Sequence, residues 1–353
     1  MRRVFLFILL HENPIMKKKI ILALIVIIVF AAAFFYWKFF GSAVSTPSGE
    51  FFYVKTGSTY EDVKNELVNK KFLNTTKWFD LTARILKYKK IKPGRYKVTK
   101  GMSLVELVRK LKNGNQTPVN LVITKLRTRE DLARKLGSYF EFDSLEAINY
   151  LDNADSLKLF NLDTNTIMTA IIPNTYIFYW NTTPEKIFKR LYDESQKFWT
   201  AERKQKADSL GLTTKQVYTL ASIVDEETNI VDDKYKISSV YLNRYRKGMK
   251  LESCPTIKFA MKNFSLTRIY DKYLDTPSPY NTYRNVGFPP GPICTPQPET
   301  IDLVLNTPST NYLYFAASSD MKGGTVFTSD FNEHLKNARA YQKEFDRRDS
   351  MKK

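Results

Sequence analysis

The longest uninterrupted apolar stretch lies near the start of the chain. Residues 20–37 (IILALIVIIVFAAAFFYW) carry no charged side chain, and three lysines stand directly before them at 17–19. About 20 apolar residues suffice for a helix to span a bilayer, and lysines collect on its cytoplasmic side. The pattern predicts a cytoplasmic tail over 1–19, a transmembrane helix over 20–40 and an extracytoplasmic remainder. A cleaved signal sequence is the alternative, although its apolar region typically has only about 7–15 residues.

One pattern of polar and apolar positions occurs three times after this stretch. It reads GSTYEDVKNEL at 57–67, GMSLVELVRKL at 101–111 and LRTREDLARKL at 126–136. Each copy has Ser or Thr at its third place, an acid three places later, and apolar residues at the seventh and eleventh places. The Ser or Thr and the acid form a capping box, which satisfies free N–H groups at a helix start. We therefore predict three helices that begin at these Ser or Thr residues and bury their apolar positions.

Short runs rich in strand-forming residues precede these helices. FFYVK at 51–55, GRYKV at 94–98 and VNLVI at 119–123 are predicted strands, whereas KWFDLTARIL at 77–86 is another predicted helix. Residues 50–115 are thus expected to form a small β-α-α-β subdomain that resembles LysM modules. It either spaces the next domain from the membrane or binds glycan, and the sequence does not separate these interpretations.

The rest of the chain is expected to form a mixed domain. Residues 116–205 are interpreted as a connecting, mainly helical region, with many aromatic residues at 171–183 (IIPNTYIFYWNTT). Core packing accounts for most such aromatic residues, although exposed Tyr and Trp rings also bind sugars. Residues 206–345 are the expected catalytic domain. The predicted fold class is therefore α+β, with a transmembrane helix, a LysM-like subdomain and a C-terminal mixed α+β domain.

A fourth capping box, Thr213 with Gln216, predicts a helix that runs to about Thr228. Its apolar residues recur at the spacing of a helix that faces the core. They are Val217, Leu220, Ala221 and Val224.

Three acids stand at the end of this helix, in the stretch LASIVDEETN. At about 100° per residue, Glu227 falls on the apolar side, whereas Asp225 and Glu226 turn away toward solvent. Burial raises the pKa of a carboxyl group, and a carboxyl that keeps its proton near neutral pH can act as a general acid. Glu227 is therefore the candidate catalytic residue. The alternative is a half-exposed helix end, with Glu227 merely paired to a nearby Lys or Arg.

Composition narrows the chemistry further. Lys and Arg outnumber Asp and Glu by 55 to 36, which gives a net charge of +19 and suits an anionic partner or simple solubility. Nucleic acid, anionic lipid and acidic cell-wall glycan are such partners, and an extracytoplasmic location disfavours the first. The two histidines and two cysteines have no zinc-binding spacing, and the usual phosphate-binding motifs are missing. We expect chemistry based on carboxylates, without metal or cofactor.

The acidic helix resembles a known motif. LASIVDEET is similar to ASI(I/V)EKET of the membrane-anchored endolytic murein transglycosylases of the MltG/YceG type, and Glu227 falls on their catalytic glutamate. Three further stretches resemble motifs of that family: LNRYRKGMKLESCPTI (242–257), DTPSPYNTYRNVGFPPGPICTP (275–296) and NYLYFAASSDMKGGTVF (311–327). The resemblance covers 16–345. Asp225 and Glu226 depart from the acidic motif of the family, and four further positions depart from its pattern, namely Asn174, Glu252, Cys254 and Thr325.

The resemblance implies an activity. The chain would cut the MurNAc–GlcNAc bond inside nascent glycan strands, leave 1,6-anhydro-MurNAc ends and so end strand elongation. One glutamate would protonate the leaving oxygen and then accept the proton of the sugar's own 6-hydroxyl. Replacing Glu227 by Gln should abolish cleavage, whereas Asp225→Asn and Glu226→Gln should retain most of it.

The resemblance also implies a substrate-binding loop and a location. Tyr280, Asn281, Thr282 and Tyr283 are expected to bind substrate, although each alone would suit a rigid proline-rich connector equally. The expected partners are peptidoglycan strands and the inner membrane, and peptidoglycan synthases are further candidates. The catalytic domain would be periplasmic. The alternative function is a non-catalytic, peptidoglycan-binding scaffold of the cell-wall synthesis machinery.

Overall fold

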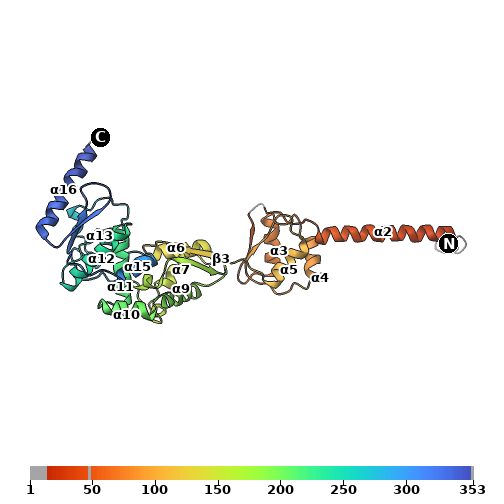
Figure 1. Ribbon diagram of the computed structural model, residues 1–353. Helices are drawn as coiled ribbons and strands as arrows, with labels where there is room; N and C mark the ends of the chain where they lie inside the picture. Colours follow the sequence, from red (N-terminus) through yellow and green to blue (C-terminus); the bar gives the residue numbers. More distant parts are fainter. Residues whose placement is uncertain (1–13, 47–48, 351–353) are drawn as a thin grey trace. The chain divides into compact units, whose positions relative to one another are not determined.

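The computed structural model describes residues 14–46 and 49–350, so most of the predicted tail over 1–19 lies outside the described residues. The chain forms two compact units (Figure 1). The first unit comprises the described residues up to Val119 together with Tyr179–Asn181, and the second unit comprises the remainder. The fold is 53% helical and 8% strand, which confirms the α+β class.

The N-terminal apolar stretch forms one long helix, α2 (Pro14–Phe40). Ile15–Phe40 is long and apolar enough to cross a membrane. Near its C-terminal end, the rings of Phe34, Phe35 and Phe39 surround Trp78, with ring centroids 5.8–6.1 Å apart. The predicted apolar helix is therefore present, and it begins earlier than predicted, at Pro14.

The first unit has the predicted β-α-α-β order. Strand β1 (Phe51–Val54) pairs antiparallel with β2 (Gly94–Lys97). Between them lie α3 (Tyr60–Asn69) and α4 (Lys77–Ile85), and α5 (Leu104–Asn113) follows. The capping boxes at the starts of α3 and α5 are present, so both helices begin where the sequence predicts.

The second unit begins at Asn120, within β3 (Val119–Ile123), which pairs with β4 (Asn174–Phe178). The elements around and after this pair are α6 (Arg129–Tyr139), α7 (Ser144–Leu151), α8 (Ala154–Lys158), the 3₁₀ helix η1 (Ile167–Ala170), α9 (Pro184–Phe198) and α10 (Ala201–Ser209). The prediction of mainly helical structure missed β4. In this strand Tyr176 and Phe178 are buried and Ile177 is exposed, the two-residue period of a half-buried strand.

Helix α11 (Thr214–Glu227) lies in the core of the second unit. The elements that follow it are α12 (Val231–Arg246), α13 (Cys254–Ala260), α14 (Asp271–Leu274), α15 (Pro298–Leu305), β5 (Tyr314–Ala317), β6 (Thr325–Thr328) and α16 (Phe331–Ser350). Every residue of α11 from Val217 to Asp225 is buried, because other helices cover more than one of its faces. Strands β5 and β6 form an antiparallel hairpin.

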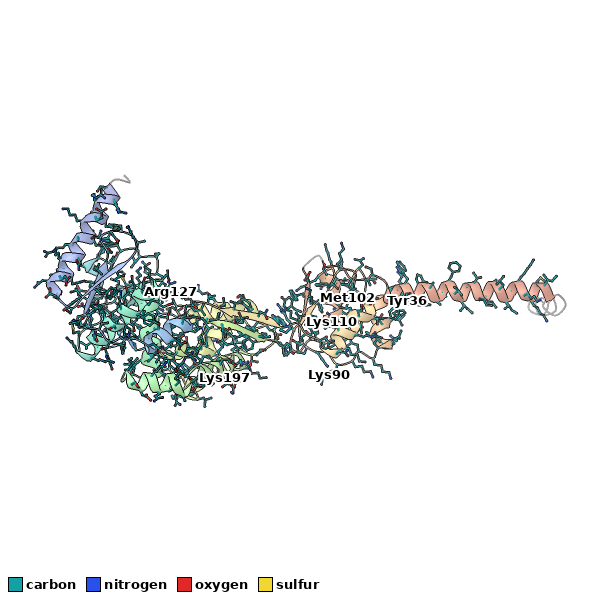
Figure 2. The ribbon with its side chains drawn as sticks, viewed as in Figure 1. Tyr36, Lys90, Met102, Lys110, Arg127 and Lys197 are labelled. Carbon is teal, nitrogen blue, oxygen red and sulfur yellow. The ribbon has the colours of Figure 1, made fainter. Side chains whose placement is uncertain are left out.

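Exposed basic side chains occur on both units. Lys90 of the first unit and Lys197 of the second extend into solvent (Figure 2). Basic side chains are therefore part of the surface of both units.

Candidate active site

Glu227 is the last residue of α11, and its side chain is half-buried. Two hydroxyl groups donate to the same carboxylate oxygen. Tyr241 Oη of α12 lies 2.5 Å from Glu227 Oε1, and Ser253 Oγ, just before α13, lies 2.8 Å from it. Oε2 has no hydrogen-bond partner among the described residues. One oxygen is thus held by the protein, and the other is left for a ligand.

The surroundings of Glu227 favour its protonated form. Burial raises the pKa of Glu227, and this effect exceeds the opposing hydrogen bonds from Tyr241 and Ser253 and the charge of Lys258. Glu227 therefore keeps its proton to higher pH than a free glutamate. This is the property that a general acid needs.

A cleft opens at Glu227. Its volume is about 370 Å³, at the lower end of the range of small-ligand sites. Glu227 and Thr228 line it together with residues of the β5–β6 hairpin, including Phe315 and Thr325. The other lining residues are Ile237, Ala316, Ala317, Ser318, Met321, Gly323, Gly324 and Tyr341. The match of 311–327 to a family motif did not predict that this segment lines a cleft with Glu227.

Two of the four predicted substrate residues are buried. Asn281 is 0% exposed, and its Nδ2 donates to the carbonyls of Leu274 and Thr276 at 2.8 Å each. Thr282 is 1% exposed, and its Oγ1 accepts a 3.0 Å bond from the backbone N–H of Ser253. Neither presents a free group to a sugar. Asn281 instead closes its own loop, and Thr282 supports the residue that donates to Glu227.

The two tyrosines of this loop are half-buried. The hydroxyl of Tyr283 lies 3.2 Å from Cys254 Sγ, and burial followed by the nearby Cys254 and Glu227 raises its pKa. Tyr280 packs against the ring of Phe259, with a centroid distance of 4.6 Å. Of the four predicted residues, Tyr283 is the one with a partly open surface beside Glu227.

The two thiols are free and differ in exposure. Cys254 is exposed, whereas Cys294 is buried and donates to the carbonyl of Ser222 at 3.4 Å. Burial raises the pKa of the Cys294 thiol, so this thiol stays protonated near neutral pH. Among the residues that the structure describes, no group of three or more His, Cys, Asp and Glu side chains could hold a metal ion.

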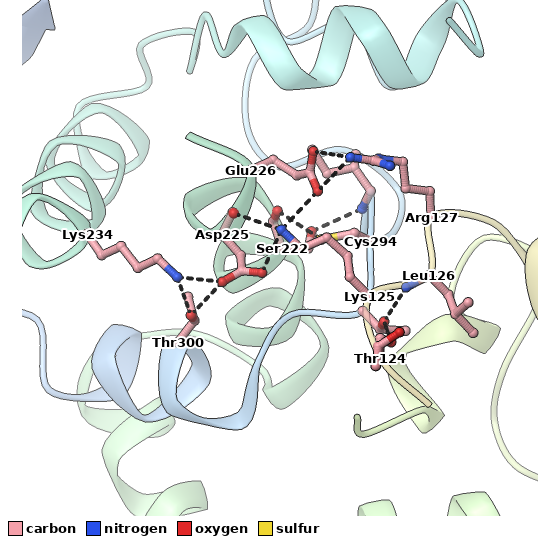
Figure 3. A network of polar contacts seen from close by, with 12 residues as sticks. Thr124, Lys125, Leu126, Arg127, Ser222, Asp225, Glu226, Lys234, Cys294 and Thr300 are labelled. Carbon is pink, nitrogen blue, oxygen red and sulfur yellow. Dashed lines mark hydrogen bonds and ion pairs between the residues drawn. The ribbon is translucent and has the colours of Figure 1, made fainter. Parts of the chain in front are cut away.

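Asp225 is not on the solvated face that the helical wheel predicts. It is 4% exposed, and Lys234 Nζ and Thr300 Oγ1 donate to its Oδ1 at 2.6 and 2.7 Å (Figure 3). Lys125 Nζ lies 3.0 Å from its Oδ2. Burial raises the pKa of Asp225, but the bonds from Lys234, Thr300 and Lys125 outweigh it and lower the pKa overall. Asp225 therefore stays ionised.

Glu226 also belongs to an ion network rather than to open solvent. Arg127 Nη2 reaches both its carboxylate oxygens, at 3.3 and 3.0 Å, and Lys125 lies 3.2 Å away (Figure 3). Lys125 also donates to the backbone carbonyl of Asp225 at 3.1 Å. Acids at a helix C-terminus are disfavoured by the helix dipole, and nearby cations relieve this. Lys125 and Arg127 directly follow β3, and no local pattern in the sequence links them to the acids of α11.

Comparisons with known proteins find several similar chains. A model of the YceG-like family matches residues 52–340. The chain is 27% identical over 304 residues to the endolytic murein transglycosylase of Bacillus subtilis, covering 82% of this chain and 83% of that protein. It is 26% identical over 315 residues to the protein of the same name from Streptococcus pneumoniae, covering 79% of this chain but only 56% of that protein. A crystal structure of a YceG-like protein from Listeria monocytogenes has a similar fold, with a TM-score of 0.54 at 24% identity over 81% of this chain and 98% of that chain.

Proposed function

Because the chain belongs to the YceG-like family, we propose that it is an endolytic murein transglycosylase, the activity named for two of its relatives. It cuts the MurNAc–GlcNAc bond within nascent glycan strands and leaves 1,6-anhydro-MurNAc ends. One observation carries this proposal: Glu227 has one oxygen fixed by Tyr241 and Ser253, and lines a cleft with the other oxygen unbonded among the described residues.

The hydrogen bonds decide which oxygen carries the proton. Oε1 accepts two bonds and therefore acts as the carbonyl oxygen of the protonated group, so the proton sits on Oε2. From Oε2 the proton passes to the glycosidic oxygen that leaves C1 of MurNAc. The carboxylate that forms is stabilised by the same two hydroxyl groups.

The second half of the reaction uses the same carboxylate as a base. Glu227 accepts the proton of the 6-hydroxyl of MurNAc, whose oxygen attacks C1 and closes the anhydro ring. The leaving sugar keeps the first proton, so Glu227 regains its starting state and no water is consumed. Most glycosidases use two carboxylates. Here Asp225 and Glu226 are bound to cations and do not line the cleft, which supports a single acid and base.

We further propose that α2 anchors the chain in the inner membrane, with its N-terminus in the cytoplasm and residues 50–115 and 206–345 outside as LysM-like and catalytic domains. Peptidoglycan strands and neighbouring synthases are then within reach, and the positive surface suits an acidic polymer. The exposed thiol of Cys254 tests this orientation. A membrane-impermeant maleimide should label it in spheroplasts, and labelling only after lysis contradicts the orientation.

Digestion of polymeric murein by the full chain in detergent tests the function. Soluble fragments with anhydro ends, identified by mass, are the expected products. Ordinary reducing ends would make the protein a hydrolase. Binding without any release of fragments would support the scaffold instead.

Replacing Tyr241 by Phe should raise the pKa of Glu227, because the lost hydrogen bond favours the charged form. Cleavage begins with protonated Glu227, so activity falls as the pH rises through this pKa. The alkaline limb of the pH profile of kcat/KM should therefore move to higher pH. At pH values below this limb, kcat/KM should be roughly tenfold or more lower than in the native chain, because the carboxylate that forms loses a hydrogen bond. A limb that moves to lower pH contradicts the assignment. The measurement is kcat/KM on soluble glycan strands across the pH range.

A further inference from the structure

Arg244, near the end of α12, is a charged side chain that is only 6% exposed. Its Nη1 donates to the carbonyl oxygens of Lys250 and Leu251 at 3.0 and 3.1 Å, and to the Glu252 carboxylate at 2.8 Å. These residues directly precede Ser253, which donates to Glu227. One end of the guanidinium therefore holds the segment that delivers a hydrogen bond to the acid.

The other end of Arg244 holds the cleft wall. Its Nε donates to the carbonyl of Leu313 at 2.7 Å, and its guanidinium lies 5.1 Å from the ring centroid of Tyr314. Both positions lead directly into Phe315, which lines the cleft together with Glu227. The neighbouring residue Asn243 has side-chain hydrogen bonds only to the segment that precedes β5. Its Nδ2 donates to the carbonyls of Thr310 and Tyr312 at 2.9 Å each.

We propose that Arg244 is a positioning residue that couples the two sides of the cleft, fixing the Ser253 segment and the entry to β5 at once. This rests on the proposed role of Glu227. A guanidinium is a rigid plane whose donors have fixed directions, so three carbonyl oxygens and a carboxylate bound to it are held in one mutual geometry. A lysine ammonium carries its donors on a flexible stem and cannot impose that geometry.

Two adjacent residues of α12 therefore have separable effects. Arg244 reaches both sides of the cleft, whereas Asn243 reaches the wall only. Loosening the segment that ends at Ser253 weakens the hydrogen bond from Ser253 to Glu227, which favours the charged form of Glu227. Loosening the segment that leads into β5 leaves this hydrogen bond in place. The other titratable groups that line the cleft or act on Glu227 are Glu226, Tyr241, Cys254, Lys258, Tyr283 and Tyr341.

The test is a titration of the Glu227 carboxyl by ¹³C NMR in the full chain, with its signal assigned by its loss in Glu227→Gln. Ser253→Ala removes the hydrogen bond from Ser253 to Glu227 completely, so it gives the full upward shift in the pKa of Glu227 that this bond can account for. Arg244→Lys should move the pKa upward by a substantial part of that shift. Asn243→Ala, the matched control, should leave the pKa unchanged and instead raise KM for glycan strands.

An unchanged pKa in Arg244→Lys, or equal shifts in Arg244→Lys and Asn243→Ala, would overturn the proposal. If Arg244→Lys does not fold, Glu252→Gln weakens the Ser253 end of the guanidinium, because it removes the charge of one of the three acceptors there. Loss of a negative charge alone would lower the pKa of Glu227, so an upward shift reports the loosened segment, and a downward shift contradicts it. The titration requires no turnover, so it remains decisive if the protein does not cleave murein.

Discussion

Replacement of Glu227 by Gln should lower murein cleavage by roughly 10³-fold or more, since a positioned acid or base contributes roughly 10²–10⁴-fold and Glu227 serves as both. The amide oxygen can still accept the bonds from Tyr241 and Ser253, but the amide has no proton to donate and is no base. The rate of release of soluble fragments from murein measures the loss. Binding to intact murein should persist.

The melting temperature of Glu227→Gln provides a second, independent test. The pKa of Glu227 is raised in the folded chain, so its contribution to stability is complete below the unfolded pKa and is lost as the pH rises through the folded pKa. A glutamine side chain does not ionise, so Glu227→Gln does not lose stability in this way as the pH rises. Glu227→Gln should therefore melt at the same temperature as the native chain, or higher, at neutral and alkaline pH. A lower melting temperature there would mean that the lost activity reports damage to the fold.

Glu226→Gln is the matched control one residue earlier. Its carboxylate binds Arg127 and Lys125 and does not line the cleft, so most of the activity should remain. Equal loss of cleavage from Glu226→Gln and Glu227→Gln would contradict the assignment of Glu227.

Asp225→Asn should cause the largest loss of stability of these changes. Breaking a buried ion pair by removing one partner costs about 3–5 kcal/mol, because the other charge stays buried without compensation. The side chain of Asp225 is 2% exposed and that of Lys234 is 11% exposed. The melting temperature of the second unit should fall by roughly 10 °C. The sequence-based expectation for Asp225→Asn concerned cleavage alone, and the buried ion pair adds this loss of stability.

The pH dependence distinguishes this ion pair from ordinary packing. The pKa of Asp225 is lowered in the folded chain, so its stabilisation is present above the unfolded value of about 3.9 and is lost as the pH falls through the folded pKa. The difference in melting temperature between the native chain and Asp225→Asn should therefore shrink in acid. A difference that stays constant with pH would contradict a charge-based role.

Local patterns predicted the parts of the fold that depend on neighbours along the chain. The capping boxes at Thr59, Ser103, Thr128 and Thr213 all form, because each needs only residues three places apart. Helical phase likewise placed Glu227 toward the interior.

The remaining features depend on distant parts of the chain. The wheel assigns one buried face to α11, but α12, α13 and α15 pack around it, so Asp225 is buried as well. Its partner Lys125 is 100 residues away in sequence. Ser253 reaches Glu227 in the same way, across 26 residues. In the loop at 275–296, the amide of Asn281 satisfies backbone carbonyls of the loop itself, which composition alone does not reveal.

Cleavage of murein in ¹⁸O-labelled water tests most directly whether Glu227 directs the sugar's own hydroxyl rather than water. The new ends should be anhydro-MurNAc, lighter by one water than reducing ends, and should contain no ¹⁸O. Incorporation of one ¹⁸O atom at each new end would show that water is the nucleophile and would contradict the account.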